Sequence, residues 1–227
     1  MYKYETHLHT DIVSACSRFK PEEIVQKYTR LGYCGLFVTD HFLNGNTTVA
    51  QGLPWRERIE RYAEGYRAVK RAAEGKLDVF FGLESSYKGT DFLVYGLDEG
   101  WLIAHPEMMD LRVSALCPYL RREGALVVQA HPYREADYID HIRLFPSEVD
   151  GLEIVNACNT ERANSLAKTL AGAYGLREFA GSDIHHAGQK ELAGVEFEEK
   201  IKTERDFADR IRRGEGVVFT LTDEGVL

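Results

Sequence analysis

Residues 21–41 read PEEIVQKYTRLGYCGLFVTDH and contain one complete helix-and-strand unit. Pro21 suits the first turn of a helix, the apolar residues that follow it recur at helical spacing, and Gly32 can end the helix. The apolar run at 35–39 then predicts a short buried strand that ends at two polar residues. A helix that leads into a polar-tipped strand is typical of α/β folds with a parallel sheet.

The same order of helical segment, apolar run and polar tip recurs along the chain. The sequence therefore predicts a single domain over residues 1–227, a length that barrels of alternating strands and helices commonly reach. Strands are expected at 4–9, 35–39, 78–83, 92–95, 125–129, 151–155 and 178–180, with a further candidate at 217–220. Helices are expected at 21–31, 55–73, 110–123, 161–174 and 204–213.

The composition favours a globular protein with a small-molecule substrate. Hydrophobic residues make up 44% of the chain, and 28 basic against 36 acidic residues give a net charge of −8, which argues against a nucleic-acid partner. The opening MYKYETHLHT lacks the apolar stretch of a signal peptide, so we expect a cytoplasmic protein without a membrane or protein partner. The four cysteines form no CxxC pair and are expected to be reduced. They are Cys16, Cys34, Cys117 and Cys158.

Polar residues that could bind a metal follow the expected strands rather than being scattered. His7 and His9 are two residues apart on the first strand, so their side chains leave the same face and can reach one ion. Asp183 and His185 repeat this spacing after a later strand. Active sites of α/β barrels lie at the carboxyl ends of the strands, so we expect these side chains to converge there.

Three further segments extend this set. Asp40 and His41 are adjacent and would point oppositely on a regular strand, so we assign His41 to a metal and Asp40 to a supporting catalytic role, with a turn or helix cap as the alternative. Glu84 ends the apolar run DVFFGL, where a buried charge needs a partner. His131 precedes Pro132, which favours an extended conformation in line with the strand; a histidine satisfied within the core is the alternative.

The candidate metal ligands are imidazoles and carboxylates, which suit Zn, Mn or Fe. They are His7, His9, His41, Glu84, His131, Asp183 and His185. A single zinc ion takes about four ligands, so this larger set predicts two or three divalent ions, with oxygen and nitrogen ligands and no cysteine sulfur. A non-catalytic domain with one structural ion would need fewer ligands than these.

Five short motifs resemble those of PHP (polymerase and histidinol phosphatase) domains, in the same order and over nearly the whole chain. They are HLHT at 7–10, TDHF at 39–42, GLE at 82–84, AHP at 130–132 and GSDIH at 181–185. The resemblance implies a distorted seven-stranded TIM-like (βα) barrel with the metal centre at the carboxyl ends of its strands. It also implies activities that include histidinol phosphatase, other phosphoesterases and polymerase-associated exonuclease.

The resemblance further implies how the ligands are shared among three ions. The first ion is assigned His7, His9, Glu84 and Asp183, the second takes Glu84 as a bridge together with His131, and the third takes His41 and His185. Family members often have one more histidine shortly after the first motif and another after the fourth strand, which DIVSACS and YGLDEGW do not supply. The residues left open as substitutes or supports are Asp11, Ser14, Cys16, Asp98 and His186.

Polar residues beside the expected metal centre could bind a substrate. Arg134, in the segment HPYR, could pair bidentately with a phosphate, and Arg18 could take the same role. Asn156 and Asn159 follow the sixth expected strand and could either bind substrate or cap the next helix.

Together these features predict a metal-dependent phosphoesterase that acts on a small-molecule or nucleotide phosphate ester. Two close cations can hold the phosphoryl oxygens and lower the pKa of a water, so that metal-activated hydroxide attacks in line and no protein nucleophile is needed. Amide or ring hydrolysis of the amidohydrolase kind is the enzymatic alternative, because the same ions polarise a carbonyl group. A metal-containing binding domain is the non-enzymatic alternative.

Overall fold

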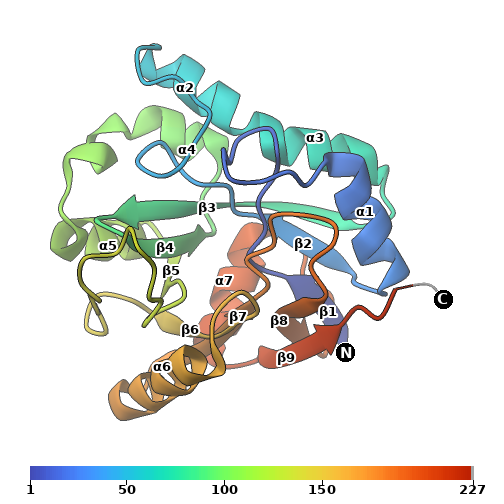
Figure 1. Cartoon of the computed structure of the whole chain (residues 1–227). Coiled ribbons are helices and arrows are strands. Elements are labelled where there is room, and N and C mark those ends of the chain that lie inside the picture. The colour runs from blue at the N-terminus through green and yellow to red at the C-terminus, as the bar shows by residue number, and fades with distance from the viewer. Residues whose placement is uncertain (226–227) are drawn as a thin grey trace.

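The computed structural model describes residues 1–225, in which nine strands form one mixed sheet that curls into a nearly closed barrel (Figure 1). The strands are β1 (Tyr2–Glu5), β2 (Gly35–Val38), β3 (Asp78–Tyr87), β4 (Thr90–Tyr95), β5 (Leu126–Gln129), β6 (Gly151–Asn156), β7 (Arg177–Gly181), β8 (Glu191–Phe197) and β9 (Val217–Thr222). They are hydrogen-bonded in the order β7-β6-β5-β4-β3-β2-β1-β8-β9. This architecture confirms the predicted α/β barrel.

The barrel closes just beyond the ends of β1 and β7. Leu8 and Ile184 form a parallel bridge there, and the N–H of His9 donates to the carbonyl of Ile184 at 3.1 Å. Lower in the barrel, β8 runs antiparallel to β1 and also contacts β7. The predicted first and last barrel strands therefore meet at the end where the candidate ligands lie.

The fourth strand of the barrel runs in the opposite direction to the one expected. β3 continues to Tyr87, and the chain turns back at Lys88 and Gly89, which both have left-handed φ angles of 50° and 77°. Two such residues form the tight turn of a β-hairpin, so β4 is antiparallel to both β3 and β5. The apolar run at 92–95 is thus a returning hairpin strand, and β4 starts at the barrel end where its neighbours β3 and β5 finish.

The helices are α1 (Pro21–Arg30), α2 (Trp55–Tyr62), α3 (Glu64–Ala73), α4 (Glu99–Ala104), α5 (Val113–Arg122), α6 (Glu161–Tyr174) and α7 (Glu204–Arg213), with a 3-10 helix η1 at Pro106–Asp110. The helix expected at 55–73 is divided at Ala63, and α4 and β8 were not predicted. β8 contains Gly194, where a Cβ would collide with the carbonyl oxygen of Tyr4 on the paired strand. Glycine is uncommon inside strands, so it weakens the strand pattern of this segment in the sequence. It is needed here because β8 approaches β1 closely.

An aromatic core fills the lower part of the barrel and is closed by α7. Phe207 of α7 lies among the strand residues, with ring centroids 4.3 Å from Phe37, 5.1 Å from Tyr95 and 6.0 Å from Phe179. α7 also contacts β3, β4 and β5, and it lies among the strands in Figure 1, whereas α6 lies at the outer edge. Access to the barrel interior is therefore left at the opposite end, where the strand-end histidines lie.

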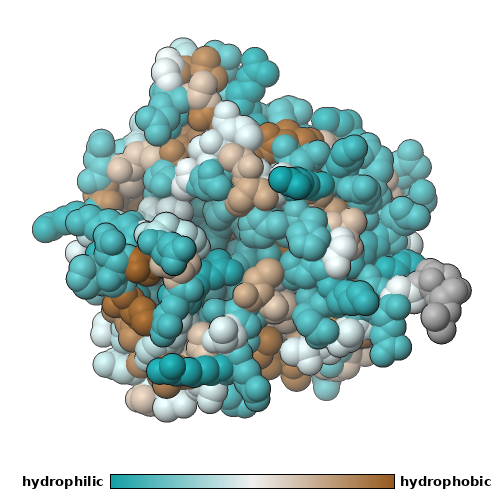
Figure 2. Space-filling view, viewed as in Figure 1, coloured by the Kyte–Doolittle hydropathy of each residue, from teal (hydrophilic) through white to brown (hydrophobic). Residues whose placement is uncertain are grey.

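The surface in the view of Figure 2 is mostly hydrophilic, with hydrophobic residues in small separate groups. Within residues 1–225, no helix combines the length and apolar character needed to cross a membrane.

A buried ion cluster joins the end of the described chain to α1. The Lys27 ammonium, 6% exposed, donates to Asp223 at 2.7 Å and to the carbonyls of Ala187 and Gln189 at 3.0 and 2.8 Å. Arg30 pairs with the same Asp223 carboxylate at 2.6 Å. The cluster thereby fixes the loop that follows His185.

Replacement of this carboxylate tests the cluster. Hydrogen bonds from Arg30 and Lys27 hold the pKa of Asp223 below its usual range, so the ionised form stabilises the fold above the unfolded pKa of about 4, and this stabilisation is lost as the pH falls through the lower folded pKa. Asp223→Asn should therefore lower the free energy of unfolding at neutral pH by about 2 kcal/mol, and the difference from wild type should shrink on acidification. Denaturant unfolding across pH measures this, with the exposed neighbour Glu224→Gln as control; equal stabilities at neutral pH would contradict it.

Candidate metal centre

The candidate ligands converge on Glu84, a fully buried carboxylate inside β3. Its Oε1 lies 3.2 Å from His7 Nε2 and 3.1 Å from His131 Nε2, and its Oε2 lies 3.5 Å from His9 Nε2 and 2.6 Å from His41 Nδ1. Four imidazoles from three segments thus surround one carboxylate at the mouth of the barrel.

Asp183 forms a second carboxylate centre on the opposite side of the same cluster. Its Oδ1 lies 3.5 Å from His7 Nε2 and 3.3 Å from His9 Nε2. β7 ends at Gly181, and Asp183 has a left-handed φ of 50°, so this carboxylate is turned inward by an irregular backbone rather than by strand alternation. His185 remains beside it, with Nδ1 2.8 Å from the Asp183 carbonyl oxygen.

Several polar atoms of this cluster are buried without a hydrogen-bond partner. They are His7 Nε2, His9 Nε2, His41 Nδ1 and Glu84 Oε2. Leaving a buried donor or acceptor unpaired costs about 1–3 kcal/mol, so a group of such atoms facing one another is unfavourable in the protein alone. Divalent cations would satisfy all of them, and the imidazole and carboxylate donors fit Zn, Mn or Fe.

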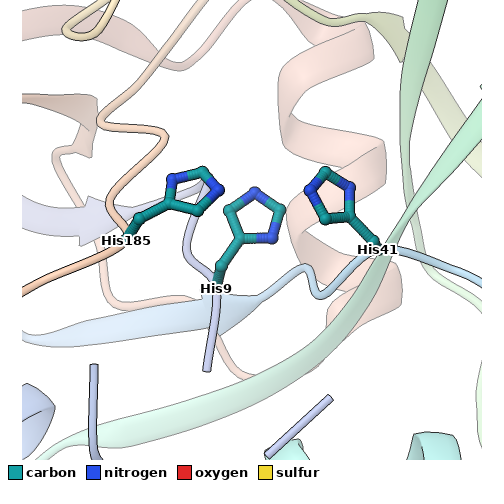
Figure 3. Close-up of side chains that lie close together, drawn as sticks. All are labelled: His9, His41 and His185. Carbon is teal, nitrogen blue, oxygen red and sulfur yellow. The ribbon is translucent and has the colours of Figure 1, made fainter. Parts of the chain in front are cut away.

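Within the described part of the chain, four groups of ligand atoms lie close enough together to hold an ion, with all atoms of a group within 4.8 Å of one another. They are His7, His9 and Glu84; His7, His131 and Asp183; Glu84, Asp91 and His131; and His9, His41 and His185. Figure 3 shows the last group, in which the His9 ring lies between those of His185 and His41. All seven sequence-predicted ligands are therefore brought together, and Asp91 joins them.

Buried partners fix which nitrogen each of the first two histidines presents. Glu153 Oε1 lies 2.9 Å from His7 Nδ1, and Ser14 Oγ lies 3.0 Å from His9 Nδ1. Each ring uses Nδ1 for this contact, which leaves Nε2 directed at the carboxylates of the centre. Glu153, which the sequence analysis did not single out, is the only charged residue in its strand segment GLEIV, and this was the available signal.

Asp40 contacts residues next to the centre and belongs to none of the ligand groups. Its Oδ1 accepts from the Thr10 amide at 2.6 Å and from the Ser14 hydroxyl at 2.7 Å, and Oδ2 accepts from the Thr10 hydroxyl at 2.7 Å. Burial raises the pKa of Asp40 to about 6. Because Ser14 contacts His9 directly, Asp40 acts on the centre through Ser14 as a positioning residue.

His131 reaches the centre by a different backbone path from the one expected. The prediction of an extended conformation before Pro132 is wrong, since His131 has a φ of 28°. Its N–H donates to Glu153 Oε2 at 2.8 Å, and its carbonyl accepts from the Arg134 N–H at 3.1 Å, so a turn replaces the end of the strand. These two bonds offset the strained backbone and aim the ring at Glu84.

The reversal of β4 explains which acid serves the centre at this strand. Asp98 and Glu99 follow β4 at the far end of the barrel, where Asp98 caps α4 through the Trp101 N–H at 2.7 Å. Asp91 lies near the start of β4, and its Oδ2 is 3.8 Å from His131 Nε2. The sequence analysis missed Asp91 because it treated the strand as parallel; the Lys-Gly pair between two apolar runs was the signal for a hairpin.

The other residues left open by the sequence are placed differently. Ser14 supports His9, as described, whereas Asp11 and His186 join none of the ligand groups. Cys16 also joins none of these groups but lines the cavity described below together with His41 and His185. Burial raises the pKa of its thiol, but the nearby His185 and His41 outweigh this effect and lower the pKa to about 6.

A cavity of about 430 Å³ opens above the centre and is large enough for a small ligand. Its lining includes His41, Asp91, Asp183 and His185, with Arg134 and Tyr138 at one side. Arg134 and Tyr138 also line an adjoining cavity of about 320 Å³, together with Asn159 and Arg162. The two cavities thus share a wall that contains a guanidinium group.

The four predicted substrate residues occupy unlike positions. Arg134 Nη2 lies 2.7 Å from Asp183 Oδ2, beside the centre, whereas Arg18 is exposed and lines neither cavity. Asn156 is buried, and its amide donates to Glu153 at 2.9 Å and to Asp183 at 3.3 Å. Asn159 faces the second cavity, and the cap of α6 is Thr160 rather than either asparagine.

Charge pairing within the cluster outweighs the effect of burial. Burial disfavours charge on His7, but the carboxylates of Glu153, Asp183 and Glu84 raise its pKa well above the usual value. Burial also opposes ionisation of Glu84, but His41 and His7 hold its pKa well below the usual range. Protons on His7 and His41 would therefore balance the carboxylates in the protein alone, and cations would replace those protons.

The chain is similar to known proteins along most of its length. A family described as PHP-associated matches residues 161–215, from α6 to just past α7. A Deinococcus radiodurans protein named a probable histidinol-phosphatase is 25% identical, over 91% of this chain and 94% of its own length.

Solved structures share the fold. A two-domain Bacteroides vulgatus protein, described as containing a predicted PHP-like metal-dependent phosphoesterase, matches with a TM-score of 0.63 and 13% identity over 96% of this chain, which spans 64% of that protein. An amidohydrolase from Chromobacterium violaceum, solved with bound sulfate and no metal, matches with a TM-score of 0.55 and 14% identity over 94% of this chain and 97% of its own. The partial family match, the whole-length relative and the shared fold agree with the resemblance of the sequence motifs to PHP domains.

Proposed function

We propose that the protein is a metal-dependent phosphoesterase that hydrolyses a small-molecule or nucleotide phosphate ester. The observation that carries this proposal is the cluster of buried, unpartnered imidazole and carboxylate atoms below a cavity with an arginine in its wall. The name of the Deinococcus relative, a probable histidinol-phosphatase, supports the same reaction class.

The ligand groups suggest how the chain would hold two or three ions of Zn, Mn or Fe. His7, His9, Glu84 and Asp183 would hold the first ion, Glu84, Asp91 and His131 the second, and His41 and His185 a third. Glu84 is the natural bridge, because its two oxygens face different histidines and it supplies negative charge to more than one group. Bound divalent ions supply positive charge for the phosphoryl oxygens and lower the pKa of a water.

Arg134 would bind and orient the phosphoryl group. Asp183 holds one side of its guanidinium at 2.7 Å, which fixes the direction of the group and leaves other N–H donors for the cavity. A planar guanidinium suits a phosphate because it can donate two parallel hydrogen bonds to it. The adjoining cavity, with Tyr138, Asn159 and Arg162, would take the leaving group.

The cavity dimensions favour a small substrate over a nucleic acid. Pockets for small molecules commonly measure about 300–1,000 Å³, and both cavities fall in this range at about 430 and 320 Å³. The net charge of −8 also disfavours binding to a phosphate backbone.

The metal content of the wild type and of Glu84→Gln tests the proposed centre. After reconstitution with Zn, Mn or Fe, elemental analysis should find at least two ions per chain, whereas Glu84→Gln should keep the fold but lose occupancy, because an amide lacks the charge needed between two cations. Activity should fall by orders of magnitude. Glu178→Gln, at an exposed position on β7, is the control; fewer than one ion in the wild type, or full occupancy in Glu84→Gln, would contradict the assignment.

The reaction class can be tested by isotope labelling. In a single turnover of para-nitrophenyl phosphate or a nucleoside monophosphate in heavy-oxygen water, we expect the label in phosphate and no phosphoenzyme, because the proposed nucleophile is metal-activated hydroxide rather than a protein side chain. Label in the alcohol would exclude attack at phosphorus. Hydrolysis of amides without any phosphate ester would support the amidohydrolase alternative instead.

Arg134→Ala tests the proposed phosphate contact. Loss of charge-assisted hydrogen bonds should lower kcat/KM by about 10- to 100-fold. Metal content must be measured alongside, because Arg134 also contacts Asp183. Arg18→Ala, which lies outside both cavities, is the matched control and should keep wild-type kinetics. An unchanged kcat/KM in Arg134→Ala would remove this residue from the substrate site.

A further inference from the structure

A second fully buried carboxylate, Glu5, lies at the end of β1 and belongs to none of the ligand groups. Within residues 1–225, its hydrogen-bond partners are N–H and hydroxyl groups rather than a basic side chain. Burying a carboxylate without a basic partner is costly, so several donors must compensate for the lost water. Which donors surround Glu5 therefore indicates what this residue does.

One oxygen of Glu5 joins the two backbone segments that carry His7 and Asp183. Glu5 Oε1 accepts from the His7 N–H at 2.9 Å and from the N–H of Ser182, the residue before Asp183, at 3.0 Å. These two N–H groups belong to segments that meet just beyond this point, at the parallel bridge that closes the barrel. The side-chain oxygen thus acts as a shared acceptor across the seam between β1 and the segment after β7.

The other oxygen of Glu5 joins this seam to two further elements. Oε2 accepts from the Tyr28 hydroxyl of α1 at 2.7 Å and from the hydroxyl of Ser182. The Ser182 oxygen in turn accepts from the N–H of Ala193 in β8 at 3.0 Å. Glu5 is therefore fixed by α1, and its contact with Ser182 is fixed by β8.

Asp183 needs such support because its backbone is strained. Its left-handed φ of 50° costs on the order of 1–3 kcal/mol unless the surrounding structure fixes it, and Glu5 holds the preceding Ser182 through both its N–H and its hydroxyl. At Gly181, a Cβ would lie 2.4 Å from that of His7, so the two segments are in close contact. His7 Nε2 and Asp183 Oδ1 are 3.5 Å apart, and this separation depends on the seam that Glu5 bridges.

We propose that Glu5 is a positioning residue of the metal centre, which sets the separation of His7 and Asp183 and thereby the affinity for the ion that they share. The inference rests on the metal centre of the proposed function. Glu5 acts by accepting N–H groups from both backbone segments, and it does not bind the ion. Residues that orient metal ligands in this way commonly contribute about 10- to 100-fold to metal affinity.

Zinc competition between the whole chain and a chromogenic chelator tests the bridge without an activity assay. Glu5→Leu is similar in size but accepts no hydrogen bond, so it should weaken zinc binding by about 10- to 100-fold. Glu5→Gln should recover most of this loss, because its amide oxygen can accept the same N–H groups while its NH2 group donates to the two hydroxyls. Equal losses in both variants would mean that charge matters rather than the bridge, and would overturn the proposal.

Two tyrosine variants test the bridge with Glu5 in place, and they decide the matter if Glu5→Leu does not fold. Tyr28→Phe removes one donor to Oε2 and should weaken zinc binding by about 2- to 10-fold, the equivalent of one hydrogen bond. Tyr33→Phe is the matched control. The two tyrosine rings are 4.8 Å apart, but the Tyr33 hydroxyl is buried without a hydrogen-bond partner, so its removal should leave zinc binding unchanged.

The outcomes separate this inference from the proposed function. If Tyr28→Phe only lowered the free energy of unfolding and kept the zinc dissociation constant of the wild type, Glu5 would be a structural residue and the inference would be wrong, with the metal centre intact. A wild type that binds no zinc would overturn both proposals. Zinc binding that depends on Glu5, in a protein that hydrolyses no phosphate ester, would support the inference and overturn the proposed function alone.

Discussion

The need to stabilise one buried carboxylate, Glu84, organises this end of the molecule. An ionised carboxylate removed from water costs several kcal/mol unless it is paired, and Glu84 has no exposed surface. Around it lie four imidazoles from three separate segments, and three of these rings have a buried nitrogen without a hydrogen-bond partner. Such an arrangement is unfavourable for the protein alone, so we infer that the fold is adapted to a bound cation.

A second layer of buried acids makes the arrangement rigid. Glu153 fixes His7 through the side chain and His131 through the backbone, and Asp40 fixes His9 through the hydroxyl of Ser14. These acids belong to none of the ligand groups and accept hydrogen bonds, so they set the direction of the rings. Ligand orientation is thereby built before any cation binds, which lowers the cost of binding.

Sequence patterns correctly predicted the helices whose ends are set by interactions between neighbouring residues. The bounds of α6 and α7 agree with the sequence prediction, because each has a threonine cap, a glycine stop and helical spacing. The two-residue spacing of His7 and His9 likewise predicted a shared site. Features that depend on residues far apart in the sequence were not predicted. β4 returns as a hairpin strand, which places Asp91 at the centre. Glu153 lies within an apolar strand, where its sequence context resembles that of a core residue.

The metal-binding and substrate-binding parts of the site have different structural origins. Strands, or turns fixed by buried acids, hold the candidate ligands. Arg134 and Tyr138 instead belong to the segment after β5, which forms the wall between the two cavities. Proteins described as a phosphoesterase and as an amidohydrolase share this fold, so the barrel alone does not choose the bond to be broken. In the proposed function, the Arg134 guanidinium group in this wall would favour the dianion of a phosphate over a neutral amide.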